Sequence, residues 1–239
     1  MPLEYAFSHD ETPSQQVWVW FPGWGFEAEV FAPLAHTLPG KHYWYRWSDH
    51  EAFDDAVEAV VQDIPANAIL VGWSLGGAIA EAAAHKTRSI QALITLATAP
   101  KFCRSKQWPY GMPAKRFEGF VSNYASNPKR TMMRFLALNA QGTESPKSII
   151  RLLDHHQLDH SDAVARHLNW LDQYDFTRSP KAPCQCLHLF AEHDALVAPP
   201  HSHGQGRYEI IPGTCHALFI QQPEFIRSQL ISFCEDQPA

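Results

Sequence analysis

The stretch "ILVGWSLGGAIAEAAAH", residues 69–85, places a single serine, Ser74, between an apolar run and an alanine-rich run. The apolar run is typical of a buried strand, and the alanine-rich run predicts a helix that begins directly after the serine. Gly72 and Gly76 flank the serine in a G-x-S-x-G pattern, because only small residues fit a sharp strand-to-helix turn. The pattern therefore predicts a serine hydroxyl exposed at the tip of such a turn.

A serine at this place needs helpers if it is to act as a nucleophile. Its hydroxyl is weak until a base removes the proton, so the motif predicts a carboxylate and a histidine, in the chain order Ser, Asp, His. In "HLFAEHDALVAP" Asp194 follows a predicted strand, and in "IIPGTCHALF" His216 lies in the loop after the next strand. Asp172 and Asp175 are weaker alternatives for the acid, because they precede a strand.

An ester-cleaving serine also needs two N–H groups that bind the oxyanion. The backbone amide of Leu75, directly after the serine, is the first expected donor. The turn "FPGWGF" after an earlier strand supplies the second, because Gly23 lets the chain fold back and turns the Trp24 amide toward Ser74. We expect the Trp24 side chain to line the acyl pocket; the alternative is an aromatic ring that only packs over the sheet.

Strands and helices alternate on both sides of the serine. Apolar runs predict strands within the stretches 17–21, 41–47, 68–72, 90–100, 184–194 and 207–213, and periodic patterns predict helices at 51–64, 75–85 and 223–234. Strands that are apolar on both faces and separated by helices predict an α/β fold with a mostly parallel sheet covered on both sides. Residues 101–176 are instead helical, basic and broken by proline. We therefore expect a core formed by residues 1–100 and 177–239, and a helical lid insertion at 101–176.

The bulk composition sets further limits. The chain has 239 residues, 45% of them hydrophobic, which suffices for a sizeable core. We expect a cytoplasmic protein, because no apolar run is long enough to span a bilayer and the first residues lack signal-peptide features. Five scattered cysteines do not indicate a disulfide framework, and we expect neither a metal nor a cofactor.

The charge is unevenly distributed. Residues 101–151 contain ten lysine and arginine residues against two glutamates, a net charge of +8, whereas the whole chain carries −6 and the remainder therefore −14. Such a cationic block on an acidic body indicates a surface for an anionic partner.

Two predicted lid helices carry basic pairs. Asn127 is expected to cap the first helix and Ser145 the second, each followed by proline. The pairs Arg130 with Arg134 and Lys147 with Arg151 are each four residues apart, where like charges weaken a helix rather than support it. They predict a receptor for acidic groups; the alternative is a solvated helix face.

Longer motifs indicate which family the chain resembles. The chain resembles the α/β-hydrolases in several stretches. They are "GWSLGG" at the Ser74 turn, "GWGFEAEVF", "RFLALNAQGTE" at 134–144, "DALVAP" and "HALFIQQPEF". Within this family it resembles the biotin-synthesis esterases that remove the methyl group from pimeloyl-acyl-carrier-protein methyl ester. One departure is Pro22, where a histidine is usual; because the oxyanion hole uses backbone amides, we expect activity to survive.

The resemblance implies a role for each matching residue. Ser74 is then the nucleophile, Asp194 the acid and His216 the base. It also implies substrate contacts at Trp24, Leu75, Phe135, Leu136, Ala137, Leu138 and Asn139, and carrier-protein contacts at Arg130, Arg134, Lys147 and Arg151. The expected partner is acyl-carrier protein, with no nucleic acid and no membrane, and the expected state is a monomer.

Other functions remain open at this point. A general short-chain carboxylesterase, or a carbon–carbon lyase of the menaquinone pathway, has the same fold and the same triad. A binding protein that keeps the fold without catalysis is a further alternative, against which the intact triad argues.

Overall fold

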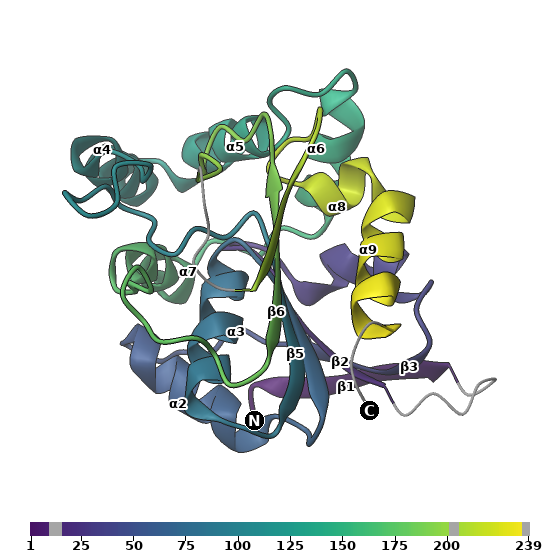
Figure 1. Ribbon diagram of the computed structural model, residues 1–239. Helices are drawn as coiled ribbons and strands as arrows, with labels where there is room; N and C mark the ends of the chain where they lie inside the picture. Colours follow the sequence, from purple (N-terminus) through teal and green to yellow (C-terminus); the bar gives the residue numbers. More distant parts are fainter. Residues whose placement is uncertain (10–15, 201–205, 236–239) are drawn as a thin grey trace.

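The computed structural model describes residues 1–9, 16–200 and 206–235 and has a seven-stranded sheet at its centre (Figure 1). The strand order is β1-β3-β2-β4-β5-β6-β7, and every neighbouring pair is parallel except β1 and β3. The strands are β1 Leu3–His9, β2 Val17–Phe21, β3 Gly40–Tyr45, β4 Ala68–Trp73, β5 Ile90–Leu96, β6 Gln185–Ala191 and β7 Arg207–Ile211. The prediction of an α/β fold with a mostly parallel sheet is confirmed.

The central strands are buried on both faces, as their unbroken apolar runs predict. In β4 all six residues are buried, and Leu70 pairs with Val19 of β2 on one side and Leu93 of β5 on the other. Parallel strands of this kind need covering layers on both faces of the sheet.

Helices supply these two layers (Figure 1). On one face lie α2 and α3, and on the other lie α8 and α9, with α1 packed against α9. Their bounds are α1 Ala32–Ala35, α2 Phe53–Asp63, α3 Leu75–Lys86, α8 Leu218–Gln221 and α9 Pro223–Glu235, and the 3-10 helix η1 Ala28–Phe31 precedes α1. Helix α2 buries Phe53, Val57 and Val60, the apolar face that its sequence periodicity predicts.

Helices α4 to α7 lie between β5 and β6 along the chain and stand at one end of the sheet (Figure 1). They are α4 Ala114–Ser126, α5 Pro128–Asn139, α6 Pro146–His155 and α7 Asp162–Asn169, followed by the 3-10 helix η2 Trp170–Asp172. Asn127 caps α5, since its side-chain oxygen accepts from the Arg130 amide at 3.1 Å. Ser145 does not cap α6 with its side chain, so that prediction is wrong; its carbonyl instead accepts from the Ser148 hydroxyl at 2.8 Å.

Strand β1 was not predicted from the sequence. It runs antiparallel to β3 at the edge of the sheet, with Leu3 opposite Tyr45 and His9 opposite Gly40. Much of the strand is partly or fully exposed, so no continuous apolar run marks it. Phe7 fixes it by stacking on His36 and His42, with ring centroids 4.2 and 4.5 Å apart.

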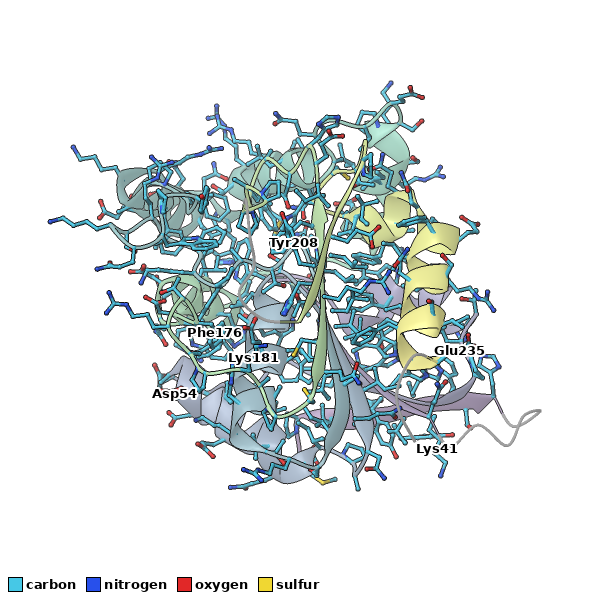
Figure 2. All side chains as sticks on the ribbon, viewed as in Figure 1. Lys41, Asp54, Phe176, Lys181, Tyr208 and Glu235 are labelled. Carbon is cyan, nitrogen blue, oxygen red and sulfur yellow. The ribbon has the colours of Figure 1, made fainter. Side chains whose placement is uncertain are left out.

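The two ends of the sheet differ in what surrounds them. Figure 2 shows Asp54, Phe176 and Lys181 toward the end away from α4, α5 and α6. The carboxyl ends of the parallel strands face α4, α5 and α6, and there loops can bring distant residues together. All five cysteines are free thiols. No helix among the described residues is long and apolar enough to cross a membrane.

Candidate active site

Ser74 sits in the sharp turn between β4 and α3 with a strained backbone. Its φ of 55° and ψ of −121° lie in a region that residues with a side chain rarely adopt. The turn is held by two bonds, from the Ser74 amide to the Leu96 carbonyl at 2.9 Å and from the Thr98 hydroxyl to the Ser74 carbonyl at 3.0 Å. These hydrogen bonds therefore hold Ser74 in its strained conformation, which is typical of a serine in a G-x-S-x-G turn.

The flanking glycines are required by close backbone approach. A Cβ at Gly72 would stand 2.4 Å from the Gly77 Cα, and one at Gly76 would stand 2.3 Å from the carbonyl oxygens of Phe21 and Pro22. Real Cβ atoms do not approach this closely, so a larger residue at Gly72 would displace the first turn of α3, and one at Gly76 would push α3 away from the turn after β2. Gly76 thus allows the start of α3 to pack against the segment directly before Trp24.

His216 and Asp194 form a buried pair. The Nδ1 atom of His216 is 2.7 Å from Oδ2 of Asp194, and their side chains are 0% and 1% exposed. The other carboxylate oxygen of Asp194 accepts from the backbone amides of Leu196 and Val197, each at 2.8 Å. Asp194 is therefore held from both sides and directs the opposite ring nitrogen of His216 away from itself.

That opposite nitrogen, Nε2 of His216, is buried and has no hydrogen-bond partner within the described residues. The ring lies beside the Ser74 turn, because the Trp73 indole donates to the His216 carbonyl at 2.9 Å and the two rings are 5.5 Å apart. A buried ring nitrogen left free in this way is suited to taking a proton from a nearby hydroxyl or water.

The alternative acids lie elsewhere. Asp175 forms an ion pair with Lys101 at 2.7 Å and also accepts from Thr177. Asp172, at the end of η2, interacts with the Cys103 thiol, whose pKa burial raises to about 12. Neither carboxylate contacts His216, and Asp194 is its acidic partner.

Two backbone amides beside Ser74 are without an acceptor. Neither the Trp24 N–H nor the Leu75 N–H donates to another group in the part of the chain that the structure describes. Gly76 presses the start of α3 against Phe21 and Pro22, directly before the Trp24 turn, so the two amides come from adjoining segments. Such a pair could hold an oxyanion.

The serine opens into a small apolar cavity of about 260 Å³. Trp24 forms one wall of this cavity and is 2% exposed. The centroid of its ring is 5.1 Å from that of Phe135 and 5.0 Å from that of Tyr124, and its indole nitrogen donates to the Val164 carbonyl at 2.7 Å. The cavity is smaller than most ligand pockets, and its lining is mostly aromatic and aliphatic. It suits a narrow apolar chain.

The predicted substrate run on α5 divides into three groups. Phe135 and Leu138 line the cavity. Leu136 and Asn139 are buried outside it, and the Asn139 carbonyl accepts from the Ala217 amide at 3.3 Å, which links α5 to the loop of His216. Ala137 is exposed and is not among the cavity's lining residues. An α-helix turns one side of a five-residue run away from any pocket, which explains the division.

The four basic residues predicted to contact a carrier are exposed on α5 and α6. Arg130, Arg134, Lys147 and Arg151 form no ion pair within the described ranges. Arg151 borders a larger open groove of about 960 Å³, between α6 and the loops of His193 and Gly213. Ser74 is not among the residues that line this groove.

Much of the cavity lining was not predicted from the sequence. Phe102, Met112, Phe117 and Leu171 line it, and so do the charged residues Lys115 and Arg116, which the sequence analysis counted only as part of a cationic block. The local signal was "AKRFEGF", which combines charge with aromatic residues, but only the packing of α4 over Ser74 gives it meaning. No cluster of three or more metal-binding side chains occurs among the described residues.

Comparisons with known proteins show the family and the fold of the chain. Residues 14–229 match the model of the alpha/beta hydrolase family. The chain is 30% identical over 229 residues to a pimeloyl-[acyl-carrier protein] methyl ester esterase of Shewanella woodyi, covering 85% of this chain and 88% of the relative. A solved esterase from Exiguobacterium antarcticum has a TM-score of 0.79 at 17% identity, covering 98% of this chain and 95% of the other, which shows the fold.

A further relative is longer than this chain. The biotin biosynthesis bifunctional protein BioHC of Saccharophagus degradans is 32% identical over an alignment of 212 residues that covers 79% of this chain. The match covers only 38% of that protein, so the chain corresponds to less than half of its length.

Proposed function

Because this chain belongs to the alpha/beta hydrolase family, we propose that it is a serine carboxylesterase of biotin biosynthesis. It would hydrolyse the methyl ester of pimeloyl-[acyl-carrier protein] to free pimeloyl-[acyl-carrier protein] and methanol, the substrate named for the Shewanella relative. The observation that carries the proposal is the 2.7 Å contact between His216 and the buried Asp194, in a chain whose Ser74 has the strained backbone of a nucleophile.

In the first half of the reaction Ser74 Oγ attacks the ester carbonyl. His216 Nε2 takes the hydroxyl proton, and Asp194 stabilises the imidazolium that forms and holds the ring in place. The carbonyl oxygen becomes an oxyanion, which the amides of Trp24 and Leu75 bind. His216 then protonates the departing methoxide, methanol leaves, and the acyl group remains on Ser74.

In the second half a water molecule replaces methanol. His216 Nε2 removes a proton from the water, the resulting hydroxide attacks the acyl carbonyl, and the same two amides bind the second oxyanion. The Ser74–acyl bond breaks, the proton passes from His216 to Ser74 Oγ, and the free carboxylate is released. No step requires a metal or a cofactor.

The proposed lid, residues 101–176, would hold the carrier. The pairs Arg130 with Arg134 and Lys147 with Arg151 are exposed and form no ion pairs among the described residues, so an acidic protein could neutralise them. The acyl chain would lie in the apolar cavity against Phe135. The net charge of +8 between residues 101 and 151 supports this arrangement, because it attracts an acidic carrier over a distance.

Turnover of the carrier-borne ester tests the proposal. The purified chain is incubated with pimeloyl-[acyl-carrier protein] methyl ester, and the loss of the methyl group is followed by mass spectrometry. We expect hydrolysis, and we expect Ser74→Ala to lower kcat by about a million-fold. Intact ester after prolonged incubation with a folded chain would contradict the proposal, and restored growth of a biotin-requiring strain that lacks its own esterase would support it.

A general short-chain carboxylesterase is the second candidate. The cavity is compatible with it, because about 260 Å³ with a mostly aromatic and aliphatic lining also accommodates a short neutral ester. Hydrolysis of small soluble esters with higher kcat/KM than the carrier-borne ester would favour this function.

A further inference from the structure

The cavity beside Ser74 has two cations in an otherwise apolar lining. Lys115 and Arg116 are the only charged residues among those that line it, and their lining neighbours Phe102 and Phe117 are buried. Lys115 and Arg116 are themselves exposed. Exposed residues that border a buried cavity mark its opening, so the two cations stand where the cavity opens to solvent.

Neither cation has a partner that explains its position. No ion pair or side-chain hydrogen bond is found for either one in the described part of the chain. Glu118, the nearest acid along the helix, forms no ion pair with them. Their positive charge is therefore free to meet a ligand.

The position of Lys115 and Arg116 in α4 indicates that their charges do not serve to stabilise the helix. Both residues lie in the first turn of the helix, where no acid is present, and Pro113 at the cap offers no side-chain acceptor. The positive end of the helix dipole disfavours cations there and favours anions. Two positive charges at this position do not stabilise the helix. An anion bound there would be stabilised both by the two charges and by the helix dipole.

We propose that Lys115 and Arg116 form an anion-binding mouth to the cavity and select esters whose far end carries carboxylate or phosphate oxygens. The inference rests on the proposed function to the extent that Ser74 is taken as the nucleophile. With the reacting ester at Ser74 and the apolar chain along Phe135, the far end of the chain leaves the cavity beside Lys115 and Arg116.

The mouth is distinct from the proposed carrier surface. Arg130 and Arg134 lie on α5 and Lys147 on α6, and none of them lines the cavity. Two sources could supply the anion: the free carboxylate of a half-esterified dicarboxylic acid, or the phosphate in the prosthetic arm of a carrier protein.

Matched small esters separate these sources. The first pair is the monomethyl ester of a seven-carbon dicarboxylic acid and methyl heptanoate, which differ in the terminal carboxylate. The second pair is the same methyl ester carried as a thioester on phosphopantetheine or on pantetheine, which differ in the phosphate. The test variant is Lys115→Met with Arg116→Met, which removes both charges and keeps apolar stems. The control is Lys106→Met with Lys129→Met, which removes two exposed lid charges outside the cavity.

We expect the test variant to lower kcat/KM about tenfold for the anionic member of at least one pair, mainly through KM. Neutral esters should change less than twofold, and the control variant should behave as the wild type. Loss confined to the first pair assigns the mouth to the acyl carboxylate, and loss confined to the second assigns it to the carrier arm. Equal effects on charged and neutral members of both pairs would overturn the proposal.

Binding of the same compounds to the chain with Ser74→Ala keeps the comparison independent of turnover. A tenfold weaker Kd for an anionic ester in the Lys115→Met, Arg116→Met background supports the mouth even if no ester is hydrolysed. In that case the proposed function fails and the anion site remains. Equal Kd values in both backgrounds, with hydrolysis intact, would instead reject the mouth alone.

Discussion

Asp194→Asn tests the coupling between the acid and the base, because the structure fixes how an asparagine would sit. One carboxylate oxygen accepts from the amides of Leu196 and Val197, each at 2.8 Å, while the other faces His216 Nδ1 at 2.7 Å. The asparagine oxygen would stay with the two amides, so its NH₂ group would face His216. Nδ1 must then accept, which moves the ring proton to Nε2, where it blocks proton transfer from Ser74.

The flipped asparagine would restore the active tautomer at a cost. It would leave two buried N–H groups without an acceptor, at about 1–3 kcal/mol each, or roughly 2–6 kcal/mol together. Since about 1.4 kcal/mol corresponds to a tenfold change in rate, kcat/KM should fall by about 30-fold to 10⁴-fold. The measurement is hydrolysis of a small neutral ester, with the melting temperature as a check on folding. A folded variant that retains more than a tenth of the activity would refute this account of His216.

Three further changes test other parts of the structure. Arg130→Glu with Arg134→Glu should weaken turnover of the carrier-borne ester, as should added salt, and leave a small soluble ester nearly unaffected; equal loss on both would contradict carrier docking there. Gly76→Ala should lower kcat for every ester by about 100-fold or more, because its Cβ would meet two carbonyl oxygens at 2.3 Å and displace the oxyanion amides; unchanged kinetics would argue against those donors. Burial raises the pKa of Glu81 from 4.5 to about 8, so the stability that it contributes is full below pH 4.5 and is lost as pH rises through 8. Glu81→Gln should therefore gain stability over the wild type by up to about 1.4 kcal/mol per pH unit across that range in urea unfolding, and a constant difference between the two proteins would contradict the buried carboxyl.

The turn at Ser74 could be predicted because consecutive residues encode it. A strand, a G-x-S-x-G turn and a helix are encoded in consecutive residues, and the close approach at Gly72 and Gly76 permits no larger side chain. The order of the strands then places Asp194 and His216 at the same edge of the sheet, after β6 and β7. Such a site can be predicted from the sequence because each of its three residues follows the end of a strand.

Features that depend on packing between distant segments were not predictable in the same way. Strand β1 is held by pairing with β3 and by Phe7 stacking on two histidines, and neither contact leaves a periodic signal. The family run on α5 named five residues, but the helix turns Ala137 to solvent. Lys115 and Arg116 border the cavity only because α4 folds back over Ser74, so the sequence showed their charge and not their place.

Covalent labelling of Ser74 tests the central claim most directly. The purified chain is treated with a fluorophosphonate, and the labelled residue is mapped by mass spectrometry while the remaining ester hydrolysis is measured on the same sample. We predict one adduct, on Ser74, with activity lost in proportion to labelling and no adduct in Ser74→Ala. Full esterase activity in a chain whose Ser74 is completely labelled, or a label on another residue with matching loss of activity, would contradict the account.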